Sequence, residues 1–203
     1  MKFRNKIIFI LLFPLVCDMV VSCCHCDDAV IKYYTNKTIA LDHLDNSGQN
    51  PVVAATGSVL KNAYGIRLKI IREETACIKK HSSFFMESAY ATSCSCPPLV
   101  TFKPKNSVVS MKFYTINDFD NLHSAGAEIT EYFKAYEKFV FTAIPDYLEK
   151  INEVLNSTTE FELAADFLLT TAPAIGTDHI FKIQLLLSDG RTMELETTQI
   201  SLI

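Results

Sequence analysis

The sequence predicts a mainly β protein, an antiparallel immunoglobulin-like β-sandwich with a short helical insertion. Apolar and polar residues alternate over several short segments, as in strands that bury one face. Short connections rich in turn residues separate most of these segments, which favours antiparallel pairing. Helical spacing of apolar residues is confined to about residues 128–156. The 203 residues, 49% apolar and 21% charged, suffice for one folded domain.

Three strands are expected in the first part of the domain. Residues 29–41 are rich in Val, Ile, Tyr and Thr, and Asn36-Lys37 would interrupt this strand. Residues 64–75 and 107–116 each alternate apolar with polar side chains. Residues 77–104 show no period and are expected to form a long excursion stabilised by disulfides.

Two helices are expected next. The first, over 128–138, is predicted from the spacing of apolar residues, and the second, over 145–156, begins at Pro145, which suits a first helical turn. The apolar residues behind the two predictions are Ile129, Tyr132, Phe133 and Tyr136, and then Tyr147, Leu148, Ile151, Val154 and Leu155.

Strands return in the last part of the chain. Period two over 161–169 and 181–187 predicts two of them, and Asp189-Gly190 predicts a hairpin with a type I′ turn. In the returning strand, the apolar positions change parity. A bulge or bend is therefore expected near Thr197-Thr198.

The N-terminus has the pattern of an export signal. Lys2, Arg4 and Lys6 precede an apolar run over residues 7–17, which is too short to span a bilayer as a helix. The segment ends in Val20-Val21-Ser22-Cys23, which resembles the lipobox of bacterial lipoproteins. An ordinary secretory signal cut nearby is the alternative.

The lipobox resemblance implies removal of residues 1–22 and a thioether-linked diacylglycerol on Cys23, usually with a further acyl chain on its amino group. Two or three fatty chains hold a protein firmly on a membrane, whereas one holds it only marginally. Residues 23–30 would then form a lipidated tether, and residues 31–203 a single sandwich domain with its helical insertion at about 128–156. The expected partner is therefore the membrane, reached through the lipid.

Five cysteines remain besides Cys17 in the signal and the lipidated residue. Export into an oxidising compartment makes disulfides the default, and the odd number leaves at least one thiol free or paired between chains. The favoured bridge joins Cys77 to Cys94 or Cys96, and a second would tie Cys24 or Cys26 to the remaining member of that pair. A metal site formed by the two Cys-x-Cys units and His25 is the alternative, although zinc prefers wider spacing.

Catalytic signatures are absent from the sequence, and no cofactor is expected. The densest polar cluster contains Asp118 and Asp120, followed by His123. The two carboxylates could share a Ca²⁺ ion, or the cluster could belong to a hydrolase assembled from several loops. The alternative is a loop in which the carboxylates cap backbone N–H groups.

Other ligand classes are constrained by composition. A net charge of −4 and a pI near 5.7 argue against a nucleic-acid partner. Trp, which sugar-binding platforms often use, is absent, so Tyr33, Tyr34 and Tyr90 are the candidate ligand aromatics.

Several stretches of the chain look like an uncharacterised lipoprotein family of Bacteroides and relatives. The stretches are Asn62–Leu68, Ser88–Ala91, Thr115–Asp120, Leu169–Pro173 and Leu187–Arg191. The resemblance implies a domain of unknown function in the cell envelope and offers no catalytic residues to transfer. Acidic residues soon after the lipidated Cys favour display on the outer face of the outer membrane in these bacteria, and Asp27-Asp28 partly fits that pattern.

Three functional hypotheses follow. The first is a non-enzymatic binding or accessory module of the envelope, with a protein or a glycan as partner. The second is the hydrolase around Asp118, Asp120 and His123. The third is a structural or appendage-type subunit, which would carry an unpaired edge strand available for strand addition.

Overall fold

The computed structural model describes residues 30–75, 100–157 and 160–203. The predicted signal and tether, all the cysteines, His25 and Tyr90 lie outside this part of the chain. The chain divides into two units. One comprises residues 33–76 and 102–203 and holds almost all described elements, whereas the other, residues 1–32 and 77–101, lies almost wholly outside the described residues.

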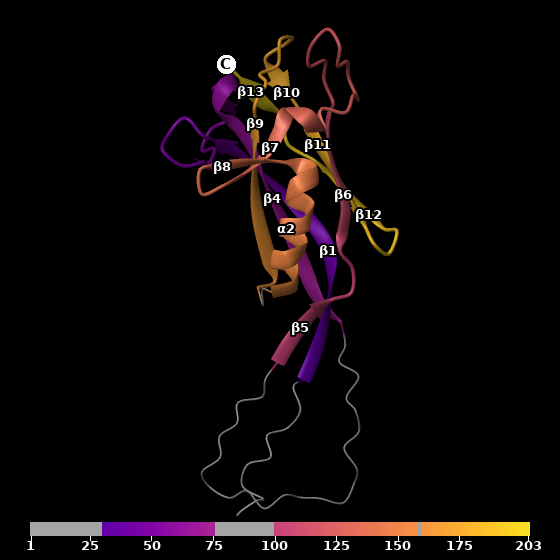
Figure 1. The fold of residues 1–203 in the computed structure, drawn as a ribbon. Helices are drawn as coiled ribbons and strands as arrows, with labels where there is room; N and C mark the ends of the chain where they lie inside the picture. Colours follow the sequence, from indigo (N-terminus) through magenta and orange to yellow (C-terminus); the bar gives the residue numbers. More distant parts are fainter. Residues whose placement is uncertain (1–29, 76–99, 158–159) are drawn as a thin grey trace, which may run out of the picture. The chain divides into compact units, whose positions relative to one another are not determined.

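The largest sheet has the strand order β2-β1-β4-β9-β7-β8, with β5 pairing β1 from outside this path (Figure 1). Neighbours along the main path pair antiparallel. The strands are β1 (Val30–Asp45), β2 (Val52–Val53), β4 (Tyr64–Thr75), β5 (Val100–Pro104), β7 (Phe133–Glu137), β8 (Val140–Ala143) and β9 (Glu162–Leu169).

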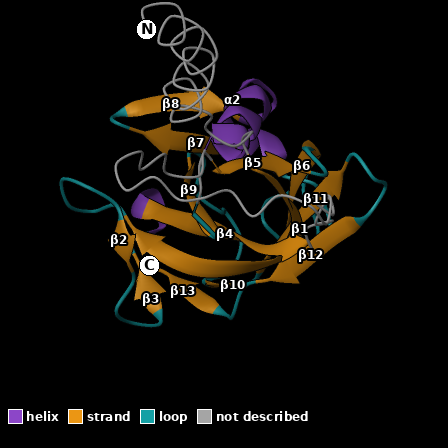
Figure 2. Cartoon of the chain, turned by 90° about the horizontal axis from the view of Figure 1, so that it is seen from below, coloured by secondary structure: helices purple, strands orange, loops and turns teal. Residues whose placement is uncertain are grey.

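Two smaller sheets complete the fold (Figure 2). One has the order β12-β11-β6, with β6 (Val108–Thr115), β11 (Phe181–Leu187) and β12 (Thr192–Glu196). The other has the order β10-β13-β3, with β3 (Ser58–Val59), β10 (Asp178–His179) and β13 (Ile200–Leu202). The described helices are the 3-10 turns η2 (Lys61–Ala63) and η3 (Thr130–Tyr132) and the α-helix α2 (Ile144–Ser157). None of them is long and apolar enough to cross a membrane.

The core lies between the large sheet and the β12-β11-β6 sheet, where aliphatic side chains surround several aromatic contacts. Tyr64 of β4 stacks on Phe181 of β11 with ring centroids 5.2 Å apart. Phe113 of β6 lies 4.5 Å from Phe133 of β7 and 5.3 Å from Phe167 of β9. The prediction of a mainly β, antiparallel protein is confirmed, and two layers meeting across such a core are consistent with a sandwich. The immunoglobulin-like topology is not confirmed by this strand order.

The helix predicted over 145–156 is confirmed as α2, at one border of the core. Ile151 and Leu155 are buried, and Tyr147 meets the Phe167 ring edge-on at 5.7 Å. Asn152 fastens α2 to β6 because its Oδ1 accepts the Val108 N–H and its Nδ2 donates to the Val108 carbonyl, both at 2.9 Å.

The helix predicted over 128–138 is wrong. This stretch forms η3 and then β7, which pairs with β9 on one side and β8 on the other. Phe133 and Ala135 are buried and the intervening Lys134 is exposed, which is period two. Ile129 is buried as well, from the loop before η3. The helix-like spacing thus arose from apolar residues of different elements.

The predicted strands and the predicted bend are confirmed. β4 and β6 lie where alternation predicted them, and β1 has a register shift between Asn36 and Thr38, at the expected interruption. The predicted bend near Thr197 is confirmed, because β12 ends at Glu196 and the chain then joins the sheet of β10 and β3 as β13.

The 188–191 turn is a hairpin, as predicted, but its type I′ assignment is wrong. Gly190 is its residue with a positive φ, 83°. The Gly190 N–H donates to the Leu187 carbonyl at 2.9 Å, and the Leu187 N–H donates to the Arg191 carbonyl at 2.9 Å. These bonds define a three-residue loop, residues 188–190, whose last residue has a left-handed backbone. The Asp189 carboxylate accepts bonds from Asn106 and Arg191, which holds the loop in this form.

Candidate binding site

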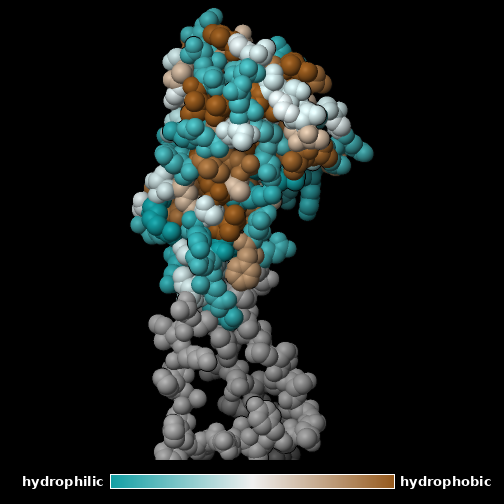
Figure 3. Space-filling view, turned by 180° about the vertical axis from the view of Figure 1, so that it is seen from behind, coloured by the Kyte–Doolittle hydropathy of each residue, from teal (hydrophilic) through white to brown (hydrophobic). Residues whose placement is uncertain are grey.

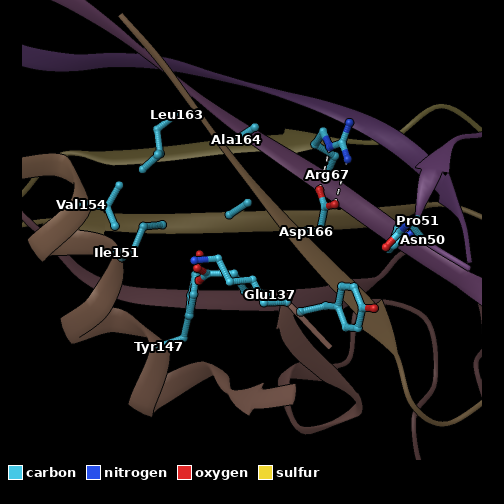
Figure 4. Close-up of a pocket in the computed structure, with 13 residues that line it drawn as sticks. Asn50, Pro51, Arg67, Glu137, Tyr147, Ile151, Val154, Leu163, Ala164 and Asp166 are labelled. Atoms are coloured by element: carbon cyan, nitrogen blue, oxygen red, sulfur yellow. Dashed lines mark hydrogen bonds and ion pairs between the residues drawn. The ribbon is translucent and has the colours of Figure 1, made fainter. Parts of the chain in front are cut away.

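A cleft of about 490 Å³ lies where β7 turns away from β9 (Figure 4). Strands β4 and β9, helix α2, the turn between β7 and β8, and the loop after β1 all contribute to it. We call it the hairpin cleft, and its principal lining residues are Arg67, Glu137, Tyr147, Ile151, Val154 and Asp166.

An ion pair between neighbouring strands lies on one side of the hairpin cleft. Arg67 of β4 and Asp166 of β9 are directly opposite in the strand register. The Arg67 Nε donates to Asp166 Oδ1 at 2.6 Å, and a second guanidinium nitrogen donates to Oδ2 at 2.8 Å. These hydrogen bonds raise the pKa of Arg67 above its ordinary value. The two side chains are 27% and 18% exposed, so a ligand in the cleft can reach a charge pair that is already matched.

The wall formed by α2 is mainly apolar. Ile151 and Val154 line it, together with the phenol ring of Tyr147. Burial raises the pKa of Tyr147 to about 12, and the nearby carboxylates of Glu137 and Asp166 act in the same direction. The Tyr147 hydroxyl is therefore neutral at physiological pH and available as a hydrogen-bond donor to a ligand.

The turn above the cleft presents aromatic side chains to solvent. Tyr136 lies edge-on to Phe139 at 6.3 Å and to Phe141 at 5.2 Å. Phe139 is 68% exposed and Phe141 is 50% exposed. We call these three residues the aromatic hairpin. On the face shown in Figure 3, apolar side chains come to the surface in several patches separated by polar ones.

The backbone at the tip of the aromatic hairpin is strained. Lys138 and Phe139 form a two-residue turn with φ of 48° and 68°, and neither is Gly, Asn or Asp. A left-handed backbone costs an ordinary L-residue about 1–2 kcal/mol. Such strain is found disproportionately at functional sites, and here it coincides with an exposed phenylalanine beside a cleft.

The Asp118, Asp120 and His123 cluster is a hydrogen-bonded loop. Asp120 Oδ1 accepts the backbone N–H groups of Leu122 and His123 and contacts His123 Nδ1, at 2.8, 2.8 and 2.9 Å. Asp118 Oδ1 accepts the Ala125 N–H at 2.8 Å. Burial would raise the pKa of Asp120, but these hydrogen bonds lower it below its ordinary value.

This arrangement uses both carboxylates for the loop itself. The described residues contain no group of three or more His, Cys, Asp or Glu side chains placed to hold a metal ion. No third His, Cys, Asp or Glu side chain of the described residues therefore joins Asp118 and Asp120, and the calcium pair stays a prediction. The Tyr132 hydroxyl lies 3.4 Å from His123 Nδ1, the nitrogen that also contacts Asp120.

The candidate ligand aromatics are separated by the fold. Tyr33 is 43% exposed, but Tyr34, on the opposite face of β1, is 3% exposed. The Arg72 guanidinium covers the Tyr34 ring, 4.3 Å from its centroid. Tyr34 is thus unavailable to a ligand at the surface, and Tyr90 and the candidate disulfide cysteines lie outside the described residues.

The hairpin cleft was missed by sequence reasoning. Arg67 fell on the polar side of an alternating strand, which is typical of a solvated face. The partners of its ion pair lie 99 residues apart, so no local pattern connects them. Lys138-Phe139 contains no turn residue, and the one available signal was period two in residues 133–135.

The fold and the cleft together define a mainly β protein with a cleft beside an exposed aromatic hairpin. A family model described as a domain of unknown function (DUF5034) matches residues 36–198, and the chain belongs to this family. The matched range includes every lining residue of the hairpin cleft. No curated protein and no solved structure matches the chain.

Proposed function

We propose that the protein is a lipid-anchored component of the cell envelope that binds a partner at the hairpin cleft and does not catalyse a reaction. The lipobox-like segment ending at Cys23 supports the anchor. The cleft and the aromatic hairpin beside it support binding. Exposed aromatics next to a concave site with a few polar groups are typical of binding surfaces.

The exposure of Phe139 is the observation that carries the binding proposal. The residue is 68% exposed although it occupies a left-handed backbone position, so the fold gains little burial there in exchange for the strain. A residue selected for stability alone at such a turn would be Gly or Asn. Contact with a partner would bury the exposed phenylalanine and so account for its presence at this position.

The charges of the cleft favour binding over catalysis. Arg67 is matched by Asp166, and Glu137 is matched by Lys150 at 2.7 Å. A phenol with a pKa of about 12, that of Tyr147, is a weak general base near neutral pH. These groups are suited to orienting a ligand through hydrogen bonds and salt bridges.

The anchor is tested by replacing Cys23. We expect Cys23→Ala to move the protein from the membrane fraction to the soluble fraction, whereas Cys24→Ala, the neighbouring control, leaves it with the membrane. Retention of Cys23→Ala on membranes after a high-salt wash would show that another feature holds the protein there. Protease treatment of intact cells then tests display on the outer face.

The binding surface is tested by photo-crosslinking in intact cells. A photoreactive phenylalanine analogue replaces Phe139 in one variant and Leu122, which is 87% exposed on a different loop, in the control. We expect a discrete adduct from position 139 and none from position 122. Equal adducts from both positions, or none from position 139, would contradict binding at the aromatic hairpin.

A further inference from the structure

We propose that β9 is a receptor strand to which an extended peptide segment of a partner protein adds along Glu162–Ala165. This inference rests on the proposed function, because the receiving edge lines the hairpin cleft. It specifies the partner as a polypeptide in β conformation and the recognition as main-chain hydrogen bonding.

The receiving edge arises because β7 is shorter than β9. Strand β9 pairs with β4 from Glu162 to Leu168, but it pairs with β7 only from Asp166 to Leu169. β7 ends at Glu137, where the chain turns into β8 (Figure 1). Residues 162–165 therefore have a strand neighbour on one side only, within the described part of the chain.

The hydrogen-bond alternation of β9 fixes which groups face the open side. The Phe161 carbonyl accepts the Arg72 N–H at 2.9 Å, so the main-chain N–H and C=O groups of the odd-numbered residues of β9 point toward β4. The Thr170 N–H donates to the Tyr132 carbonyl at 2.8 Å, so the main-chain N–H and C=O groups of the even-numbered residues point toward β7. By this register, the N–H and C=O groups of Glu162 and Ala164 point into the space that β7 has vacated.

The walls of the cleft set the side-chain pattern of the incoming strand. Ile151 and Val154 of α2 lie on one side of the β9 edge, and the Arg67–Asp166 ion pair lies on the other. Successive side chains of a strand alternate between faces. The matching segment therefore alternates apolar residues, which contact α2, with polar residues, which contact the ion pair and solvent.

Charge complementarity specifies one end of the segment. Lys138 lines the cleft at the turn, and no ion pair links it to a described residue, whereas its neighbour Glu137 is paired with Lys150. An incoming strand continues the line of β7, so one of its ends meets the turn. We therefore assign an acidic residue to that end of the segment.

The test selects peptides and then locates their binding site. Linear twelve-residue peptides displayed on phage are selected against the full-length protein in detergent. We expect enriched sequences that alternate apolar and polar residues and include an acidic end. When a synthetic copy of an enriched peptide is added, the Ala164 amide should exchange with solvent at about one tenth of its free rate or slower, as measured by NMR. The reason is that this N–H gains a hydrogen-bond acceptor.

A matched pair of proline variants tests the main-chain contact. Ala164→Pro removes an N–H that points into the cleft and leaves the ladder to β4 intact. The control is Ala143→Pro on β8, where the register directs the N–H to the outer edge of the sheet. We expect affinity to fall about tenfold or more in Ala164→Pro and to stay within about twofold in Ala143→Pro.

The outcomes separate this inference from the proposed function. No enriched peptide, unchanged Ala164 exchange, or equal loss of affinity in both proline variants would overturn strand addition. An adduct at position 139 together with any of these results would leave the binding function standing. Slower Ala164 exchange at rising protein concentration without peptide would identify a second copy as the occupant and refute a separate partner. Should Ala164→Pro fail to fold, the wild-type amide exchange decides alone.

Discussion

Replacing the tip of the aromatic hairpin should make the protein more stable while it loses binding. The change is the double variant Lys138→Asn/Phe139→Gly, which installs the dipeptide that two-residue type I′ turns prefer. In the wild type, both positions have a positive φ, 48° and 68°. The variant keeps the turn and its pairing between β7 and β8, and it removes the strain together with the exposed ring.

The expected magnitude follows from opposing terms. Left-handed backbone costs about 1–2 kcal/mol for each ordinary L-residue, and Asn and Gly relieve most of it. The glycine lowers the stability by about 0.5–1 kcal/mol, because it gives the unfolded chain more conformational freedom. The lost edge contact between Phe139 and Tyr136 contributed about 0.5–1.5 kcal/mol at most, and less here because Phe139 is 68% exposed. A net gain of about 1 kcal/mol results, or about 2–4 °C in melting temperature.

Urea unfolding and position-specific crosslinking measure the two effects. We expect a higher unfolding free energy for the double variant and loss of the crosslinked partner, with the photoreactive group now at Phe141. Phe139→Ala is the control, because it removes the ring but leaves the left-handed position strained, and it should not gain stability. A double variant less stable than the wild type would refute the reasoning, since the aromatic tip would then serve the fold.

Three further changes test the fold around the site. Gly65→Ala should lower the unfolding free energy by about 1–3 kcal/mol in urea titrations, because the new Cβ would lie 2.8 Å from the Phe167 carbonyl oxygen. Burial lowers the pKa of His179 below its ordinary 6.5, so the unfolded chain binds more protons at acidic pH. Stability should therefore decline as the pH falls below about 6.5, and less so in His179→Phe, as measured by unfolding at pH 7.5 and 5.5. Asn152→Ala should destabilise the attachment of α2 by about 1–3 kcal/mol, seen as a lower urea midpoint, because both main-chain groups of Val108 lose their partner.

The strands of the core could be predicted because their pattern is local. In β4, the alternation of Ile66, Leu68 and Ile70 with polar residues marks both the strand and its buried face. The bend after β12 could be predicted for the same reason, since a change of parity is visible in one stretch of sequence. The stripe that marks α2 is equally local.

The binding site could not be predicted, because it is assembled by pairing between distant segments. Arg67 and Asp166 meet only through the register of β4 with β9. The turn at Lys138-Phe139 forms without turn residues, and it is closed by the pairing of β7 with β8, in which Glu137 lies opposite Val140. Tertiary context here overrides local preference, and this also explains the false helix over residues 128–138.

The open segment of β9 differs from the edge strands of the sheets in how it is protected. Exposed edges are commonly protected by shortness, charge, bulges or cover. In the large sheet, the edge strand β2 has two residues and the opposite edge strand β8 has four, and in the β12-β11-β6 sheet the edge strand β12 carries Glu194 and Glu196 toward solvent. The open part of β9 instead places the small Ala164 in a recess between α2 and the aromatic hairpin. The Glu162–Ala165 edge therefore lies in a cleft, where its free main-chain groups are flanked by side chains of α2 and of the aromatic hairpin. This is the arrangement that a selective receptor strand requires.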